Sequence, residues 1–263
     1  MSGPVSFFVE RDGVFVGQDP ARGPWLPDYC HAGPVTGLVA RAVERALGGD
    51  KVLTRLTVDL HRPVPMAGIR VRAQVARDGR RVATATATVT DLDDRLCASA
   101  SSMHVAEEDI GPVPTAPVAR LARADAVPGR IGSGKMGHDL PMFGHFVEVA
   151  IAAGEGRGRG PATMWMRTPP LLPDDEPSSF QRLCPLADCG NGISSNAPLD
   201  QIGFVNSDIT IVAHRRTQSD WLVSRAISHW HETGVGLARA EISDEDGPVA
   251  SVLQTVLLSP TGR

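Results

Sequence analysis

The sequence lacks the features that mark membrane, secreted and nucleic-acid-binding proteins. No run approaches the ~18 apolar residues of a membrane span, and residues 1–13 have no basic segment followed by an apolar one. The formal net charge of −4 is unlike the basic balance of most nucleic-acid-binding domains. We therefore expect a cytoplasmic protein with neither nucleic acid nor a membrane as its partner.

Motifs for thiol, metal and serine chemistry are also missing. The four cysteines include no Cys-x-x-Cys pair, so we expect reduced thiols. No Gly-x-Ser-x-Gly motif occurs, which argues against a serine hydrolase of that type. His229 and His231 have no third ligand close by in the sequence, so no metal site is predicted.

What the chain does contain is a repeat of itself. With an offset of 153 residues, positions 56–101 and 209–254 align without a gap. One copy can therefore serve as the structural control for the other: a polar residue peculiar to one copy is a better functional candidate than one that the fold needs in both. The identical pairs are Thr57/Thr210, His61/His214, Arg62/Arg215, Arg72/Arg225, Ala73/Ala226, Val82/Val235, Ala85/Ala238, Ala87/Ala240, Asp91/Asp244 and Asp93/Asp246.

Each copy is predicted to fold as β-β-α-β-β-β-β. Apolar residues recur at helical spacing from Ala32 to Leu47, with Pro34 in the first turn and Gly48 after the end. Alternating residues predict the strands, and the repeat predicts a short second helix near 186–193. We divide the chain into an N-terminal unit (1–105), a Pro/Gly-rich linker (106–137) and a C-terminal unit (138–263). The expected strands are 6–9, 14–17, 56–60, 69–75, 82–90 and 96–105, then 147–152, 163–167, 209–213, 221–230, 235–243 and 249–258.

Several motifs resemble those of the acyl-CoA thioesterase II family, and most of them lie in the second copy. The resemblance implies an α+β fold, the double hotdog, in which two tandem units each wrap a long antiparallel sheet around a central helix. The motifs are Gly33–Gly37 in the first copy, and Trp165–Arg167, Pro173–Asp175, Leu186–Asp188, Gly203–Asp208 followed by His214-Arg215, and Val249–Gln254 in the second.

The resemblance also implies a catalytic set. In the family an Asp, a Thr or Ser, and a Gln hold the attacking water; the Asp matches Asp188 and the Gln matches Gln254. The hydroxyl position falls on Asn206, a departure from the pattern, and Ser207 is the alternative if the register shifts by one residue. The aligned positions of copy one, Val35, Leu53 and Ser101, lack this set. We therefore expect one active site per chain, with copy one as scaffold and as a wall of the acyl pocket.

The chemistry expected of these residues is thioester hydrolysis. Asp188, placed at the start of the second helix, would accept a proton from water or orient it. The backbone N–H groups of Cys189 and Gly190 would polarise the carbonyl, and Gln254 would fix the water from the facing strand. The implied reaction converts a fatty or related acyl-CoA to free acid and CoA without a cofactor.

Other interpretations remain open from the sequence. A hotdog hydratase or dehydratase would need an Asp–His pair, for which His31 with Asp28 is the one candidate near a helix start. A non-catalytic acyl-CoA or acyl-carrier binding protein would keep the pocket and lose the water. Asp188 could be a simple helix N-cap, and His61 and His214, present in both copies, are predicted to serve the fold. Homo-oligomer formation is left open.

Overall fold

The computed structural model describes residues 5–118, 120–131, 138–152 and 159–261. Its first half follows the predicted order of elements. The helix α1 (Ala32–Leu47) has the predicted bounds, with His31 as N-cap and Gly48 after its end at a φ of 75°, a conformation that favours glycine. The other elements are β1 (Phe8–Arg11), β2 (Val14–Gly17), the 3-10 turn η1 (Asp19–Ala21), β3 (Val52–Leu60), β4 (Ile69–Asp78), β5 (Val82–Asp91) and β6 (Leu96–Val105).

The second half repeats this order with a broken helix. After η2 (Arg123–Asp125) and α2 (Phe143–Phe146), the strands β8 (Glu148–Ile151) and β9 (Ala162–Arg167) lead to α3 (Ser179–Ala187) and α4 (Gly190–Ile193). The predicted linker contains one short strand, β7 (Val127–Pro128), which pairs with β8; residues 119 and 132–137 lie outside the described ranges. The last strands are β10 (Ile202–Asn206), β11 (Asp208–Ala213), β12 (Leu222–Trp230), β13 (Val235–Asp244) and β14 (Gly247–Pro260).

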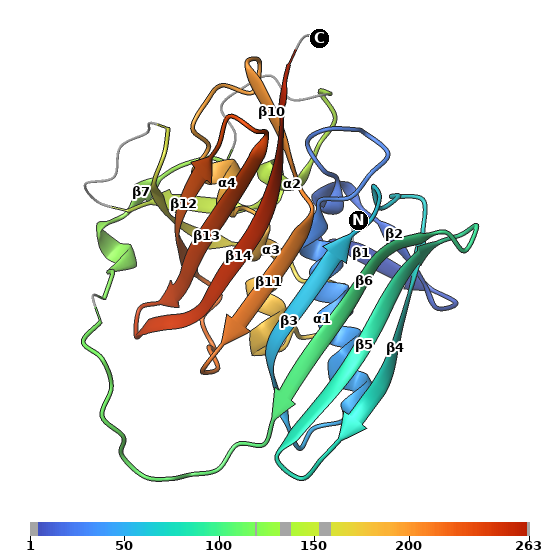
Figure 1. Ribbon diagram of the computed structural model, residues 1–263, viewed down its shortest axis with the longest axis vertical. Helices are drawn as coiled ribbons and strands as arrows, with labels where there is room; N and C mark the ends of the chain where they lie inside the picture. Colours follow the sequence, from blue (N-terminus) through green and yellow to red (C-terminus); the bar gives the residue numbers. More distant parts are fainter. Residues whose placement is uncertain (1–4, 119, 132–137, 153–158, 262–263) are drawn as a thin grey trace.

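One antiparallel sheet unites the two halves. Across the described residues its order is β1-β2-β4-β5-β6-β3-β11-β14-β13-β12-β9-β8-β7, with β10 pairing to β14. The halves join where β3 and β11 lie side by side (Figure 1). Thr57 and Thr210, an identical pair of the repeat, face each other at this seam with their Oγ1 atoms 3.1 Å apart. The repeat therefore builds a pseudo-dimer whose local two-fold axis passes between these two threonines.

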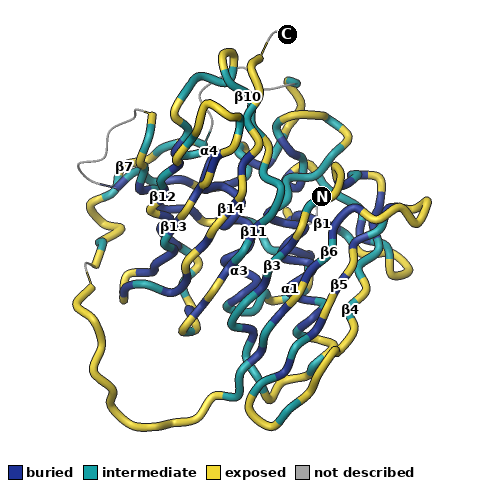
Figure 2. Tube along the Cα trace, viewed as in Figure 1, coloured by how far each residue is buried: buried dark blue, intermediate teal, exposed yellow. Residues whose placement is uncertain are grey.

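The core lies between the sheet and the helices. Buried and exposed residues alternate along β5 and β13, which is the pattern of strands with one face against a core. In Figure 2 buried residues recur along these strands and α1, whereas the connecting segment 107–118 is exposed. Within the described ranges, no helix is long and apolar enough to cross a bilayer.

Asp91 and Asp244, identical in the repeat, both cap the turn after a core strand. Asp91 Oδ1 accepts the N–H groups of Asp93 and Arg95, at 3.0 and 2.9 Å. Asp244 Oδ1 accepts the N–H of Asp246 at 2.9 Å. These shared carboxylates thus have the same role in chain reversal, as expected of residues that the fold requires.

Two expectations drawn from the repeat are wrong. The second helix begins at Ser179, not near 186, because the Ser178 hydroxyl accepts the N–H of Gln181 as an N-cap. The offset of 153 also fails in the last strand. Ala85 and Ala238 are equivalent, but Ala85 pairs with Ser102 on β6, whereas Ala238 pairs with Gln254 on β14. The structural counterpart of Gln254 is therefore Ser102, not Ser101. Because successive residues of a strand point to opposite faces of the sheet, the predicted alignment compared Gln254 with a residue on the other face.

Candidate active site

A cleft of about 1600 Å³ opens between the two halves. Copy one contributes residues near the start of α1 and the end of β3, and copy two contributes α4, β9 and β10. The predicted residues Asp188, Cys189, Asn206 and Ser207 line this cleft, whereas Gly190 and Gln254 do not. The first copy is thus more than a scaffold, because it supplies side chains to the same cavity.

Asp188 lies at the C-terminal end of α3, not at a helix start. The helix is interrupted at Asp188 and Cys189 and resumes as α4, which contains Gly190 and Gly192. A carboxylate is unfavourable at the C-terminal, negative end of a helix dipole. The Asp188 carboxylate also lies against the N-terminal, positive end of α1, which offsets this effect. A Cβ on Gly33 would lie 2.9 Å from the Pro185 Cα and 3.1 Å from the Asp188 Cβ. The close approach of α1 to α3 therefore requires glycine at this position.

Four donors from both copies surround the Asp188 carboxylate. Oδ2 accepts from the Gly33 N–H at 3.0 Å and lies 2.8 Å from His31 Nδ1. Oδ1 accepts from Asn206 Nδ2 at 2.8 Å and from Gln254 Nε2 at 3.3 Å. Burial alone would raise the pKa of this carboxyl, but the charge of His31 and the hydrogen bonds outweigh it, so the pKa lies below its ordinary value.

Asn206 ends β10 and reaches Asp188 from the strand side. The alternative residue, Ser207, donates its hydroxyl to the Thr255 carbonyl at 3.2 Å, so the register places the amide beside the carboxylate. Asn206 Nδ2 donates to Asp188, and its Oδ1 is buried without a hydrogen-bond partner among the described residues. A buried acceptor without a donor is costly, and Asn206 is a residue of the cleft lining.

Gln254 holds Asp188 from behind. Its side chain is fully buried on β14, where Nε2 donates to Asp188 and Oε1 accepts from the Asn191 N–H at 3.4 Å. A Cβ on Gly190 would lie 2.8 Å from this Oε1. Gln254 contacts Asp188 and helix α4 and does not line the cleft, and its contact with the attacking water stays a prediction.

The proposed backbone donors also need correction. The Cys189 N–H donates to the Leu186 carbonyl at 3.0 Å, so it closes a turn of the chain and cannot also polarise a substrate. Gly190 is buried and does not line the cleft. Burial and the nearby Asp188 charge raise the pKa of the Cys189 thiol well above its ordinary value, so this thiol stays protonated.

His31 was predicted as a member of an Asp–His pair, but its predicted partner, Asp28, is wrong. It contacts Asp188, which is 157 positions away, and not the neighbouring Asp28. Its ring stacks on Phe143 with centroids 4.2 Å apart and planes 9° apart, and it lines the cleft. Comparing aligned positions of the two copies could not reveal this pair, because it forms at the junction between them.

The lining of the cleft includes basic and aromatic side chains. Arg62, Arg130 and Arg159 are among its lining residues. Trp25 and Phe204 also line it, with ring centroids 5.2 Å apart in an edge-to-face arrangement. Within the part of the chain that the structure describes, no three His, Cys, Asp or Glu side chains gather as metal ligands.

Solved structures with the same architecture support the fold. The chain superposes on a Novosphingobium aromaticivorans protein over 96% of its length and 98% of the other's, with a TM-score of 0.76 and 19% identity. It superposes on the tesB protein of Mycobacterium avium subs paratuberculosis over 97% of each chain, with a TM-score of 0.70 and 17% identity. It superposes on a hot dog fold protein of Alicyclobacillus acidocaldarius over 97% of its length and 96% of the other's, with a TM-score of 0.72 and 17% identity. The fold is therefore the predicted double hotdog.

Family comparison identifies the chain more directly than these structures do. By sequence, no curated protein matches it. Residues 21–105 match the acyl-CoA thioesterase N-terminal domain, and residues 118–258 match the acyl-CoA thioesterase C-terminal domain. Together the two matches span most of the chain in the order of its two halves. The chain accordingly belongs to the acyl-CoA thioesterase family and is a thioester hydrolase.

Proposed function

We propose that this protein hydrolyses a fatty or related acyl-CoA to the free acid and CoA in the cleft beside Asp188. The observation that carries this proposal is the buried Asp188 carboxylate, which lies at the cleft and is held by donors from both halves. Such an arrangement fixes an ionised group beside the reacting atoms without exposing it to bulk water.

The lining of the cleft suits the two ends of such a substrate. Arg62, Arg130 and Arg159 supply positive charge for the phosphate groups of CoA. Trp25 and Phe204 supply apolar surface for an acyl chain. A volume of about 1600 Å³ is above the range of typical small-ligand pockets, as a long thioester requires.

Asn206 takes the place of the usual hydroxyl residue in holding the attacking water. Its Oδ1 accepts no bond from the described residues and is buried, so a small rotation of the side chain toward the cleft would let it accept one from a water. Gln254 acts through Asp188, which it fixes from the core. Ala32, the first residue of α1, lines the cleft, and the positive end of that helix favours the negative charge that develops on the carbonyl oxygen.

The test is release of free thiol from acyl-CoAs of increasing chain length. Wild type should release thiol from at least one of them, and Asp188→Ala should lower kcat/KM by about 10²–10⁴-fold, the range of catalytic groups of this kind. Ser101→Ala is the control, because Ser101 is an exposed residue of copy one outside the cleft. No thiol release by wild type at any chain length contradicts hydrolysis and leaves a binding role. Normal turnover by Asp188→Ala contradicts the site.

Hydration of an unsaturated acyl thioester is a second candidate, because the structure supplies the Asp–His pair that this reaction needs. The pair is Asp188 with His31 at 2.8 Å. Incubation with a 2-enoyl-CoA separates the two reactions: hydrolysis releases thiol and keeps the double bond, whereas hydration removes the conjugated double bond and releases no thiol. We expect thiol release to dominate.

A further inference from the structure

The Asp188 carboxylate is already fully occupied as an acceptor. A carboxylate offers about four lone-pair sites, and four donors fill them: the Gly33 N–H and His31 Nδ1 on Oδ2, Asn206 Nδ2 and Gln254 Nε2 on Oδ1. To take a proton from water directly, Asp188 would have to release one of these donors. The same hydrogen bonds lower its pKa and so weaken it as a base.

His31 is arranged so that its second nitrogen can act in the cleft. An ionised carboxylate only accepts hydrogen bonds, so Nδ1 must carry the proton that lies between it and Asp188 Oδ2. The Gly33 N–H lies 3.3 Å from Nδ1 but 3.0 Å from Asp188 Oδ2, and it therefore goes to the carboxylate. In the neutral ring this leaves the lone pair on Nε2, which has no hydrogen-bond partner within the described ranges.

Two contacts fix the ring in this orientation. The Asp188 carboxylate holds Nδ1, and the parallel Phe143 ring holds the imidazole plane. The His31 side chain is 15% exposed and lines the cleft. A carboxylate that holds one imidazole nitrogen while the other faces the reacting atoms is the logic by which an acid residue sets the tautomer of a histidine base.

We infer that His31 is the general base that activates the attacking water, and that Asp188 is its positioning residue. This inference rests on the proposed hydrolysis of acyl-CoA in the same cleft. It places the base on copy one and the carboxylate on copy two. Neither copy holds the complete site alone.

The step balances without any further reactant. His31 Nε2 takes one proton from water while the water oxygen bonds to the thioester carbonyl carbon. When the tetrahedral intermediate collapses, the C–S bond breaks and its electron pair leaves on the CoA sulfur. The proton on Nε2 then passes to this thiolate. The products are the carboxylic acid and the CoA thiol.

Three substitutions at position 31 separate a base from a structural residue. His31→Phe keeps a ring against Phe143 but has no nitrogen. His31→Asn keeps an N–H donor for Asp188 but has no basic atom. His31→Ala removes both. The full-length variants are assayed by thiol release on whichever acyl-CoA wild type hydrolyses best, with thermal unfolding as the check on folding.

We expect kcat to fall by about 10²–10⁴-fold in all three variants, with KM changed less than threefold. Retention of kcat within tenfold by His31→Asn would show that His31 only holds Asp188 and would overturn the assignment, as would a nearly normal kcat in His31→Ala. If one variant does not fold, the remaining two still decide between these results. Inactive wild type refutes the proposed hydrolysis, whereas active wild type with an active His31→Asn refutes only the base.

Discussion

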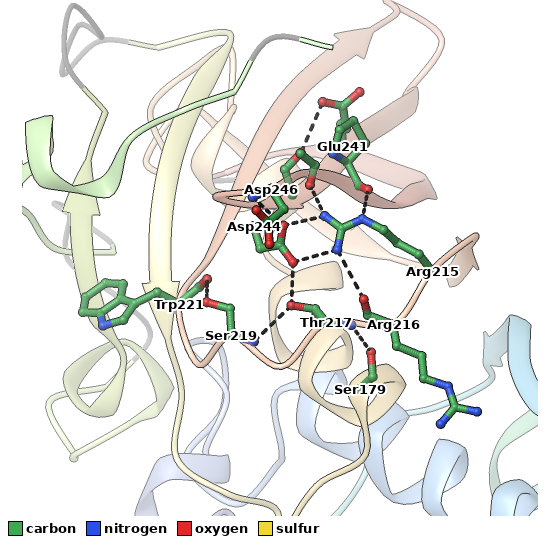
Figure 3. Close-up of polar contacts among 12 residues, drawn as sticks. Ser179, Arg215, Arg216, Thr217, Ser219, Trp221, Glu241, Asp244 and Asp246 are labelled. Carbon is green, nitrogen blue, oxygen red and sulfur yellow. Dashed lines mark hydrogen bonds and ion pairs between the residues drawn. The ribbon is translucent and has the colours of Figure 1, made fainter. Parts of the chain in front are cut away.

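Arg62 and Arg215 occupy the same position in the two copies, yet the structure uses them differently. In copy two, Arg215 pairs with Asp244 and donates to the Pro248 and Gly247 carbonyls at 2.8 and 2.6 Å (Figure 3). In copy one, the turn contains its own arginine: Arg95 pairs with Asp91 at 2.7 Å. Arg62 is thereby released from the turn and lines the cleft.

This difference shows that identity within a repeat does not establish a shared role. The shared carboxylate keeps its function in both turns, but the partner that neutralises it changes from Arg95 to Arg215. The turn of copy two, Asp244–Gly247, contains no basic residue, and Arg215 from the segment that follows β11 fills the place. Of this duplicated pair, only the copy-one residue lines the cleft.

The largest expected effect is the difference in the free energy of unfolding between Arg215→Ala and Arg62→Ala. Arg215→Ala leaves the buried Asp244 without its ion-pair partner, and we expect a loss of about 2–3 kcal/mol in the free energy of unfolding. Arg62→Ala should cost less than about 0.5 kcal/mol, as for most surface substitutions. Urea unfolding of both variants measures the contrast. Equal losses would mean that Arg62 also serves the fold.

A second contrast compares Gln254 with its true counterpart, Ser102. Gln254→Ala removes one donor from Asp188, and we expect kcat/KM to fall about 10–100-fold, which corresponds to about 1.4–2.7 kcal/mol. Ser102→Ala removes the bond from its hydroxyl to the Ala85 carbonyl, far from Asp188 in sequence and in the other half of the sheet. It should leave kcat/KM within twofold. Steady-state thiol release measures both, and equal effects would remove the asymmetry between the copies.

A smaller effect should appear in KM for Arg62→Ala. Loss of one charge at an exposed phosphate contact is worth about 1 kcal/mol, which corresponds to a rise in KM of about fivefold. The rise should occur with acyl-CoA and should vanish with an acyl N-acetylcysteamine thioester, which carries no phosphate. If KM rises equally with both thioesters, Arg62 does not bind the phosphates.

The smallest effect concerns pH. Burial alone would raise the pKa of Asp244, but the hydrogen bonds of Arg215 and Thr217 and the charge of Arg215 hold it below the ordinary value. A depressed folded-state pKa adds stability above the unfolded pKa of about 3.9, and that stability is lost as pH falls through the lower folded value. The free energy of unfolding of Asp244→Asn should therefore be lower than that of wild type at pH 6. The two values should approach each other as pH falls below about 4. A constant difference between pH 6 and pH 3 in unfolding experiments would contradict this.

Much of the fold could be predicted because the repeat shows it twice. The helix of copy one and the order of its strands follow from periodicity. The pairing of β3 with β11 at Thr57 and Thr210 was not predicted from the sequence. The start of the second helix was missed because its cap, Ser178, precedes the part of the chain that the repeat aligned. The shorter turn after β13 was missed because a single offset cannot represent a one-residue deletion.

The candidate site was predictable only where its residues match a motif. Asp188, Asn206 and Gln254 do come together, although the structure leaves their chemical roles as proposals. His31 was tied to the wrong carboxylate because Asp28 is its neighbour in sequence. Its real partner depends on the packing of α1 against α3, which Gly33 permits and which no local pattern encodes.

The central claim is that one site is assembled from both copies, and a double-mutant cycle between His31 and Asp188 tests it most directly. Thiol release gives kcat/KM for wild type, His31→Ala, Asp188→Ala and the double variant. If the two residues act as one unit, the double variant should be within threefold of the slower single variant. If the two losses multiply, the residues act independently, and the account of a site shared between the copies is contradicted.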